Sequence, residues 1–130
     1  MMAHYESDSL TVEWNRTLDA VVMNWQDFAK GDTYREGLDE GLDLVIQKNA
    51  RNWLADLREM GTVTPEDREW TQDEWHPRAF DSSLRNMAIV QPESVVANMS
   101  VEDMVSEVGE NTTSRIFDNR DDAEAWLRDQ

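Results

Sequence analysis

The sequence predicts an α/β fold with a mixed five-stranded sheet and four helices, and three observations support this. Residues 10–15 alternate apolar and polar side chains, and a short turn separates them from an apolar run at 20–25, which indicates an antiparallel hairpin. Two later runs, 53–57 and 87–90, are almost wholly apolar, as in strands covered on both faces of a mainly parallel sheet. Segments with helical spacing separate the runs. The expected order is ββαβαβαβα.

The length of 130 residues suits one domain with its own core. We expect residues 1–8 to form a flexible N-terminal segment and residues 9–130 to form the domain. The chain has no cysteine, so it has neither disulfides nor thiol chemistry. Its apolar runs are too short for a membrane span, and its N-terminus lacks the basic and apolar regions of a signal peptide. The expected location is the cytoplasm.

The formal net charge of −16 is the strongest feature of the composition. Such a chain lacks the basic surface that neutralises phosphates, so we expect it to bind neither nucleic acid nor anionic membranes. The acids are dispersed along the chain, and only Lys30 and Lys48 are lysines. This pattern is typical of proteins adapted to high salt, although an ordinary acidic protein is the alternative.

The adaptation to salt leads to a direct prediction. Dispersed carboxylates repel one another until ions screen them, so the melting temperature should rise steeply between low and molar KCl. Thermal melts over a KCl series measure this effect. A melting temperature that stays constant over the series would exclude adaptation to salt.

The first helix is expected to begin at Gly31-Asp32, with Asp32 as N-cap, and to end at Asn49. Gly37 and Gly41 are one turn apart near its apolar stripe, which favours a close approach of this helix to the sheet. The stripe consists of Tyr34, Leu38, Leu42, Val45 and Ile46.

The stretch 52–70 combines a buried strand, a polar loop and the start of the second helix. Thr64 fits the N-cap of that helix and Pro65 its first position, while Pro77 should end or kink it near Trp75–His76. Asp56 and Arg58 share one face of the strand end. They form either a structural ion pair or a polar anchor for a ligand.

The last third of the chain should supply two helices and an edge strand. Val101, Met104, Val105 and Val108 are spaced as on one face of a helix, which Gly109 would end. A short strand is expected at Thr113–Phe117. It is more polar than the other strands, so we expect it at an edge of the sheet. The final helix should cover Arg120–Arg128.

Several phrases of the sequence resemble the STAS-like proteins, and more narrowly the small stand-alone SpoIIAA-like domains related to anti-sigma-factor antagonists. The phrases are WLADLR, TPEDREWTQDEWHPRA, MAIVQPESVVANMSVEDMV and DDAEAWL, and the resemblance extends from about residue 11 to 127. It implies a five-stranded mixed sheet and a non-enzymatic role. That role is to bind a partner protein, sometimes under phosphorylation control, or a small or lipid-like ligand.

The resemblance is incomplete at the phosphorylated serine of the antagonists. Where those proteins carry Asp-Ser-Ser-Gly-Leu, this chain has Gly61-Thr62-Val63-Thr64-Pro65. Thr62 and Thr64 are the only hydroxyls there, and Thr64 is the candidate phosphosite. Phosphate would meet a helix N-terminus but also nearby carboxylates, so a plain N-cap is the main interpretation of Thr64.

The candidate contact residues lie around the second helix. Trp70 and Trp75 are five positions apart, so both cannot face the sheet, and an exposed tryptophan is a typical interface anchor. The alternative is that the loop after Pro77 buries both. Trp14, Trp25, Trp53 and Trp126 are assigned to the core. The full set of candidate contacts is Arg58, Thr62, Thr64, Trp70, Trp75, His76 and Arg78.

His76, Arg78 and Arg58 have two interpretations: a small anion site, or a capping or exposed histidine beside surface arginines. No catalytic, cofactor or metal motif is evident.

Two functions follow as alternatives. In the first, a protein partner or a second copy of the chain docks on the loop and helix around Arg58–Trp75. In the second, a small apolar or lipid-like ligand binds between the second helix and the sheet. A cavity of several hundred Å³ lined by Trp, Met and Val would favour the ligand. A flat exposed patch around Trp70 or Trp75 would favour the partner.

Overall fold

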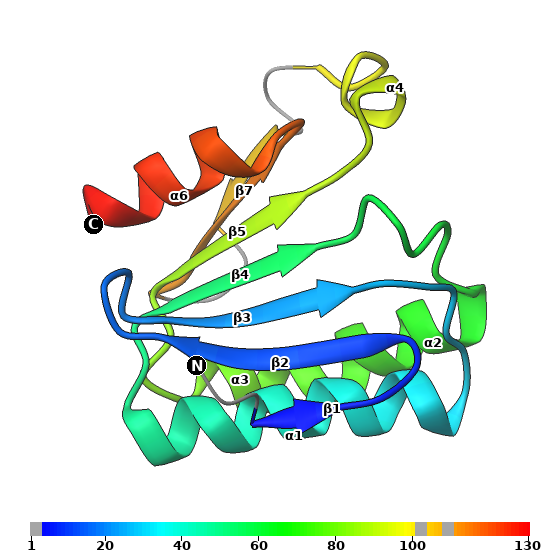
Figure 1. Cartoon of the computed structure of the whole chain (residues 1–130), viewed down its shortest axis with the longest axis horizontal. Coiled ribbons are helices and arrows are strands. Elements are labelled where there is room, and N and C mark those ends of the chain that lie inside the picture. Colours follow the sequence, from blue (N-terminus) through cyan, green and yellow to red (C-terminus); the bar gives the residue numbers. More distant parts are fainter. Residues whose placement is uncertain (1–3, 101–103, 108–110) are drawn as a thin grey trace.

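The computed structural model has a seven-stranded mixed sheet, and helices connect several of its strands (Figure 1). The structure describes residues 4–100, 104–107 and 111–130. The strand order is β1-β2-β3-β4-β5-β7-β6. The strands are β1 Tyr5–Glu6, β2 Leu10–Asn15, β3 Ala20–Trp25, β4 Asn52–Asp56, β5 Asn86–Val90, β6 Val105–Glu107 and β7 Thr113–Phe117. The helices are α1 Asp32–Lys48, α2 Pro65–Trp70, the π-helix η1 Thr71–Trp75, α3 His76–Phe80, α4 Glu93–Val96 and α6 Arg120–Arg128.

The pairing confirms the N-terminal hairpin and the parallel centre of the sheet. Strands β2 and β3 are antiparallel, while β3, β4, β5 and β7 are parallel neighbours. Two additional strands make the expected number of five wrong. Tyr5–Glu6 pairs with β2, so part of the segment 1–8 that we expected to be flexible belongs to the sheet.

The third expected helix is wrong over residues 105–107, which form β6 and pair antiparallel with β7. The apolar spacing of that segment fits a helix, but the free side of β7 offers it a partner strand. As a result β7 lies inside the sheet, not at its edge as expected. The remainder of the expected helix, at 101–103 and 108–109, is outside the described residues.

Two apolar clusters cover the two faces of the sheet. The larger cluster joins α1, η1 and α3 to side chains such as Met23 and Trp53, and the smaller one packs α6 against Leu54 and Ala88. Figure 1 shows α1, α2 and α3 beneath the sheet and α6 above it. The parallel strands end on one side, where the loops to α1, α2 and α4 leave the sheet.

Helix α1 approaches the sheet closely at its two interior glycines, as predicted. A Cβ atom on Gly37 would lie 2.6 Å from a methyl carbon of Leu10, and one on Gly41 would lie 2.6 Å from the Trp53 ring. Asn49 ends the helix in the left-handed conformation, also as predicted. Two details are wrong. Gly31 is the N-cap in place of Asp32, and Ile46 is 61% exposed because Leu44 takes the buried position.

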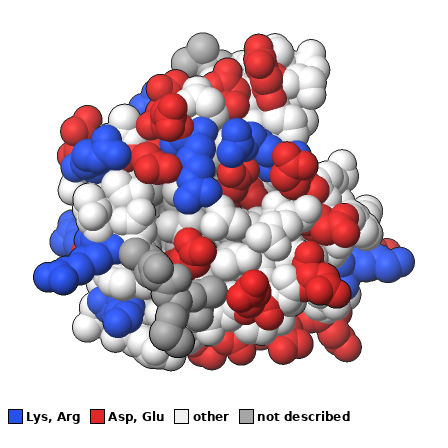
Figure 2. Space-filling model, viewed as in Figure 1, with Lys and Arg blue, Asp and Glu red and all other residues white. Residues whose placement is uncertain are grey.

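The acidic side chains are spread over the molecular face shown in Figure 2, with arginines and lysines among them. No described helix is long and apolar enough to cross a membrane.

Candidate functional site

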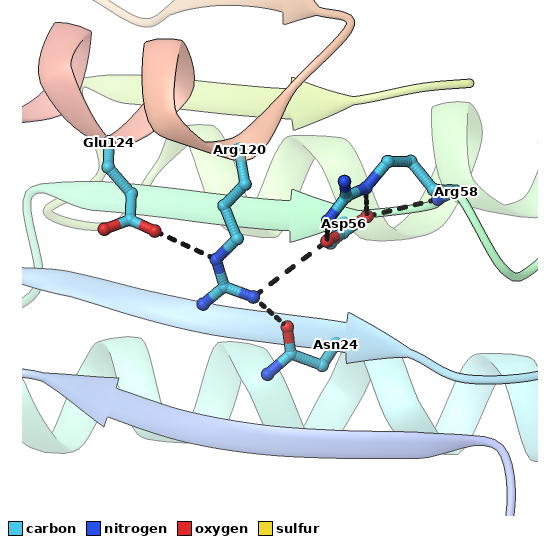
Figure 3. A network of polar contacts seen from close by, with 5 residues as sticks. All are labelled: Asn24, Asp56, Arg58, Arg120 and Glu124. Carbon is cyan, nitrogen blue, oxygen red and sulfur yellow. Dashed lines mark hydrogen bonds and ion pairs between the residues drawn. The ribbon is translucent and has the colours of Figure 1, made fainter. Parts of the chain in front are cut away.

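Asp56, at the end of β4, anchors a polar network on the α6 side of the sheet (Figure 3). The Arg58 guanidinium donates to both carboxylate oxygens of Asp56, over 3.0 and 2.7 Å, and the Arg58 backbone N–H donates over 3.2 Å. Arg120, at the start of α6, donates to Asn24 over 2.6 Å and to Glu124 over 3.0 Å, and lies 3.9 Å from Asp56. The strand end therefore holds a structural ion pair, one of the two predicted alternatives.

The charged groups of this network are paired with one another, so few of them are available to bind a ligand. Burial by itself would raise the pKa of Asp56, but the hydrogen bonds from Arg58 outweigh burial and lower that pKa. Both arginines are neutralised by carboxylates. Arg58 therefore ties the loop after β4 to the sheet, and Arg120 ties α6 to the same strands.

Thr64 is the N-cap of the second helix, as predicted. Its hydroxyl accepts from the Asp67 backbone N–H over 3.3 Å and donates to the Asp67 carboxylate over 2.9 Å. The same carboxylate accepts from the Gly31 backbone N–H over 2.8 Å and from Arg35 over 3.2 Å. Asp67 is 2% exposed. It therefore joins the loop before α1, helix α1 and the start of α2 at one buried point.

The second helix does not end at Pro77, but its π-helical part ends at Trp75 and α3 begins at His76, which is where we expected an end or a kink. Residues 71–75 form a π-helix in which the His76 backbone N–H bonds to the Thr71 carbonyl, and α3 follows directly. Proline has no N–H, and in a regular helix its ring would meet the carbonyl of residue 73. The wider π turn accommodates that ring. π-Turns inside helices are frequent at functional sites.

The two tryptophans of the second helix differ in burial. Trp75 is 1% exposed, and its indole N–H donates to the Leu38 carbonyl over 3.0 Å. The expectation that Trp75 contacts a partner is therefore wrong. Trp70 is half-buried, and the Arg35 guanidinium lies 5.3 Å from its ring centre. No flat aromatic patch is formed by these two residues.

The anion site, one of the two interpretations of Arg58, His76 and Arg78, does not form, because the three side chains have separate surroundings. Arg78 pairs with Asp39 over 2.8 Å on the surface, and Arg58 belongs to the network on the α6 side. His76 stacks on Phe80, with ring centres 4.9 Å apart, and faces a cavity. Burial lowers the pKa of His76, so its imidazole is neutral at neutral pH.

That cavity lies between the second helix and the sheet. An outer chamber of about 390 Å³ is bounded by the loop after β4, one side of α2 and η1, and the loop into α4. An inner chamber of about 130 Å³ extends into the larger apolar cluster. The chambers share Tyr34, Leu57, Val63, Thr71 and His76 as lining residues, so they adjoin.

The inner chamber has an apolar wall and the outer chamber a mixed one. Trp25, Trp53, Trp75, Met87 and Ile89 line the inner chamber. Thr62, Arg68, Gln72, Gln91 and Val95 line the outer one. Of the predicted contact residues, Thr62, Trp75 and His76 are in these walls, whereas Arg58, Thr64, Trp70 and Arg78 are not.

Sequence reasoning missed Tyr34, Arg68, Gln72, Gln91 and Val95. For Arg68 and Gln72 the sequence offered one indication, because their spacing with Thr71 places all three on one side of the helix. For the others it offered none. Within the described ranges, no three His, Asp or Glu residues are placed to bind a metal ion.

The mixed sheet with helices on both faces defines an α/β domain of the STAS-like class. The sequence matches the model of the SpoIIAA-like family over residues 20–128, and the chain belongs to that family. No curated protein matches the sequence.

A solved structure with the same fold supports this assignment. It is an uncharacterized protein of the DUF3478 family, with a SpoIIAA-like fold, from Shewanella loihica PV-4. The two chains are 14% identical and superpose with a TM-score of 0.63 over 95% of this chain and 98% of the other. At the level of the family, membership indicates a regulatory or protein-interaction domain that is generally not an enzyme.

Proposed function

We propose that the chain is a non-enzymatic binding domain that takes a small apolar or lipid-like molecule into the cavity between the second helix and the sheet. The cavity is the observation that carries this proposal. Its outer chamber of about 390 Å³ is within the usual size range of ligand sites. Three tryptophans and a methionine line the inner chamber, as expected for an apolar guest.

The side chains around the cavity support binding without chemistry. Thr71 donates its one hydroxyl proton to the Asp67 carbonyl over 2.7 Å, so the Tyr34 hydroxyl, 3.0 Å away, donates to Thr71. Neither hydroxyl is paired with a base that would make it a nucleophile. His76 stacks between aromatic rings and has no carboxylate partner among the described residues. A site with this composition holds a molecule and does not transform it.

The test is binding of 1-decanol, measured by calorimetry and by the fluorescence of the tryptophans around the inner chamber. The parent chain should bind it, and Val63→Phe should weaken binding at least about tenfold, because Val63 lines both chambers. Ile46→Phe is the matched control, since Ile46 is exposed on α1 and lines neither chamber. Equal binding by the parent and Val63→Phe would show that the cavity is not the site.

A second candidate function is docking of a protein partner, or of a second copy of the chain, on the loop and helix around residues 58–75. Family membership favours it, and so does the exposed Val95 at the cavity rim, which is 45% accessible. A two-fold contact is the commonest form of self-association.

Trp70→Ala tests that candidate. A half-buried aromatic anchor typically contributes about 2 kcal/mol or more to binding, so this variant should fold and lose any self-association of the parent in sedimentation velocity. Ile46→Ala, on the exposed side of α1, is the control. If Trp70→Ala associates as the parent does, the docking surface does not include Trp70.

A further inference from the structure

The cavity wall lacks acidic residues in a chain that is rich in them. Asp and Glu account for 28 of the 130 residues. Among the described residues that line the outer and inner chambers, none is Asp or Glu. The second helix carries Glu66, Glu69 and Asp73 on its exposed side. The helix side that faces the cavity presents Arg68, Thr71 and Gln72 in their place.

Arg68 is the one charged residue of this wall, because partial burial lowers the pKa of His76 and its imidazole is neutral at neutral pH. Among the described residues, four arginines form ion pairs: Arg35, Arg58, Arg78 and Arg120. Arg68 forms none with any described residue, and its side chain makes a single long hydrogen bond of 3.5 Å to the Val63 carbonyl.

The neighbouring carboxylate does not neutralise Arg68. Asp67 precedes it directly, but the Asp67 oxygens already accept from the Gly31 N–H, Thr64 and Arg35. Arg68 is exposed at the cavity mouth and forms no ion pair with a described carboxylate, although the chain as a whole carries −16. A guanidinium in this state offers paired N–H donors, which match a carboxylate or a similar planar anion.

We infer that the ligand is an amphipathic anion, with its charged head group at Arg68 in the outer chamber and its apolar tail in the inner chamber. This inference rests on the proposed function and adds the charge class of the ligand. Gln72 and Gln91, in the same wall, offer amide groups to the head group. A cation would meet Arg68 with like charge, and a purely apolar molecule would leave Arg68 without a partner.

The experiment compares three probes with one tail and different head groups: decanoate, 1-decanol and decylammonium, each below its micelle concentration. Calorimetry at fixed pH and ionic strength should show decanoate binding at least about tenfold more tightly than 1-decanol. Arg68→Gln should remove most of this preference, measured as the ratio of the decanoate and 1-decanol affinities of the same variant. Arg78→Gln is the matched control, because Arg78 is exposed on the same helical stretch and lies outside the cavity.

The outcomes separate the two proposals. If none of the three probes binds, the proposed function fails and this inference fails with it. If 1-decanol or decylammonium binds as tightly as decanoate, the cavity is a binding site but the ligand is not an anion. Undiminished decanoate binding by Arg68→Gln would likewise overturn the role of Arg68 while leaving the proposed function intact.

Discussion

Trp75→Ala is expected to lower the free energy of unfolding by about 3–5 kcal/mol, the range found when a buried tryptophan is truncated to alanine. The Trp75 side chain is almost fully buried, packs against Trp53 with ring centres 5.1 Å apart, and donates its indole N–H to the Leu38 carbonyl. Truncation removes these contacts and leaves the carbonyl of Leu38 without that donor. Urea unfolding of the parent and the variant measures the loss.

Trp70→Ala is the control for this prediction, since it removes the same side chain from a half-buried position on the same helix. Its loss should be clearly smaller than that of Trp75→Ala. Equal losses would mean that both tryptophans contribute to the core alike, and that the burial difference between them has no energetic consequence.

Trp75 also shows how far the sequence could predict the site. Five-residue spacing in an α-helix predicted that only one of the two tryptophans can face the sheet. Trp75 is buried in the larger apolar cluster, yet Trp70 also packs against that cluster, half-buried. The π turn at residues 71–75 changes the angle between the positions before and after it, so α-helical spacing does not apply there. A π turn is not visible as a periodicity in the sequence.

The fold was predictable where local patterns and tertiary packing agree. Helix α1 has a long apolar stripe and two glycines that match the sheet, and its observed limits are within one residue of the prediction. Residues 105–107 have a helical apolar pattern as well, yet they pair with β7. A strand of three residues is too short to show a strand-like alternation of apolar and polar residues, so the helical pattern was the only one visible in the sequence.

The cavity was predictable in position but not in composition. One alternative placed a ligand between the second helix and the sheet, and the cavity lies there, where the loop after β4 leaves the C-terminal end of a central parallel strand. The lining comes from four separate segments, at residues 25, 34–38, 53–76 and 87–95. No single stretch of sequence shows that these segments meet, so Arg68 could not be distinguished from other surface arginines.

Asp67→Ala is expected to lower the free energy of unfolding by at least about 1.5–3 kcal/mol, the range for one hydrogen bond to a charged group. The buried Asp67 carboxylate accepts from the Gly31 N–H, the Thr64 hydroxyl and Arg35. Its removal leaves the Gly31 N–H and Thr64 without their acceptor and disconnects α1 from α2. Glu66→Ala is the matched control, because Glu66 is the exposed carboxylate next to Asp67 on the same helix.

The pH dependence of stability separates a charged Asp67 from a merely well-packed one. Burial alone would raise the pKa of Asp67, but the hydrogen bonds from Gly31, Thr64 and Arg35 outweigh it and hold that pKa below the ordinary value. A carboxyl with a depressed folded-state pKa contributes stability fully above its unfolded pKa of about 3.9, and that contribution is lost as the pH falls through the folded pKa. Asp67→Ala should therefore lose stability at neutral pH and converge on the parent in acid. A constant difference between the two proteins from pH 7 down to the acid limit of folding would show that the charge of Asp67 contributes nothing.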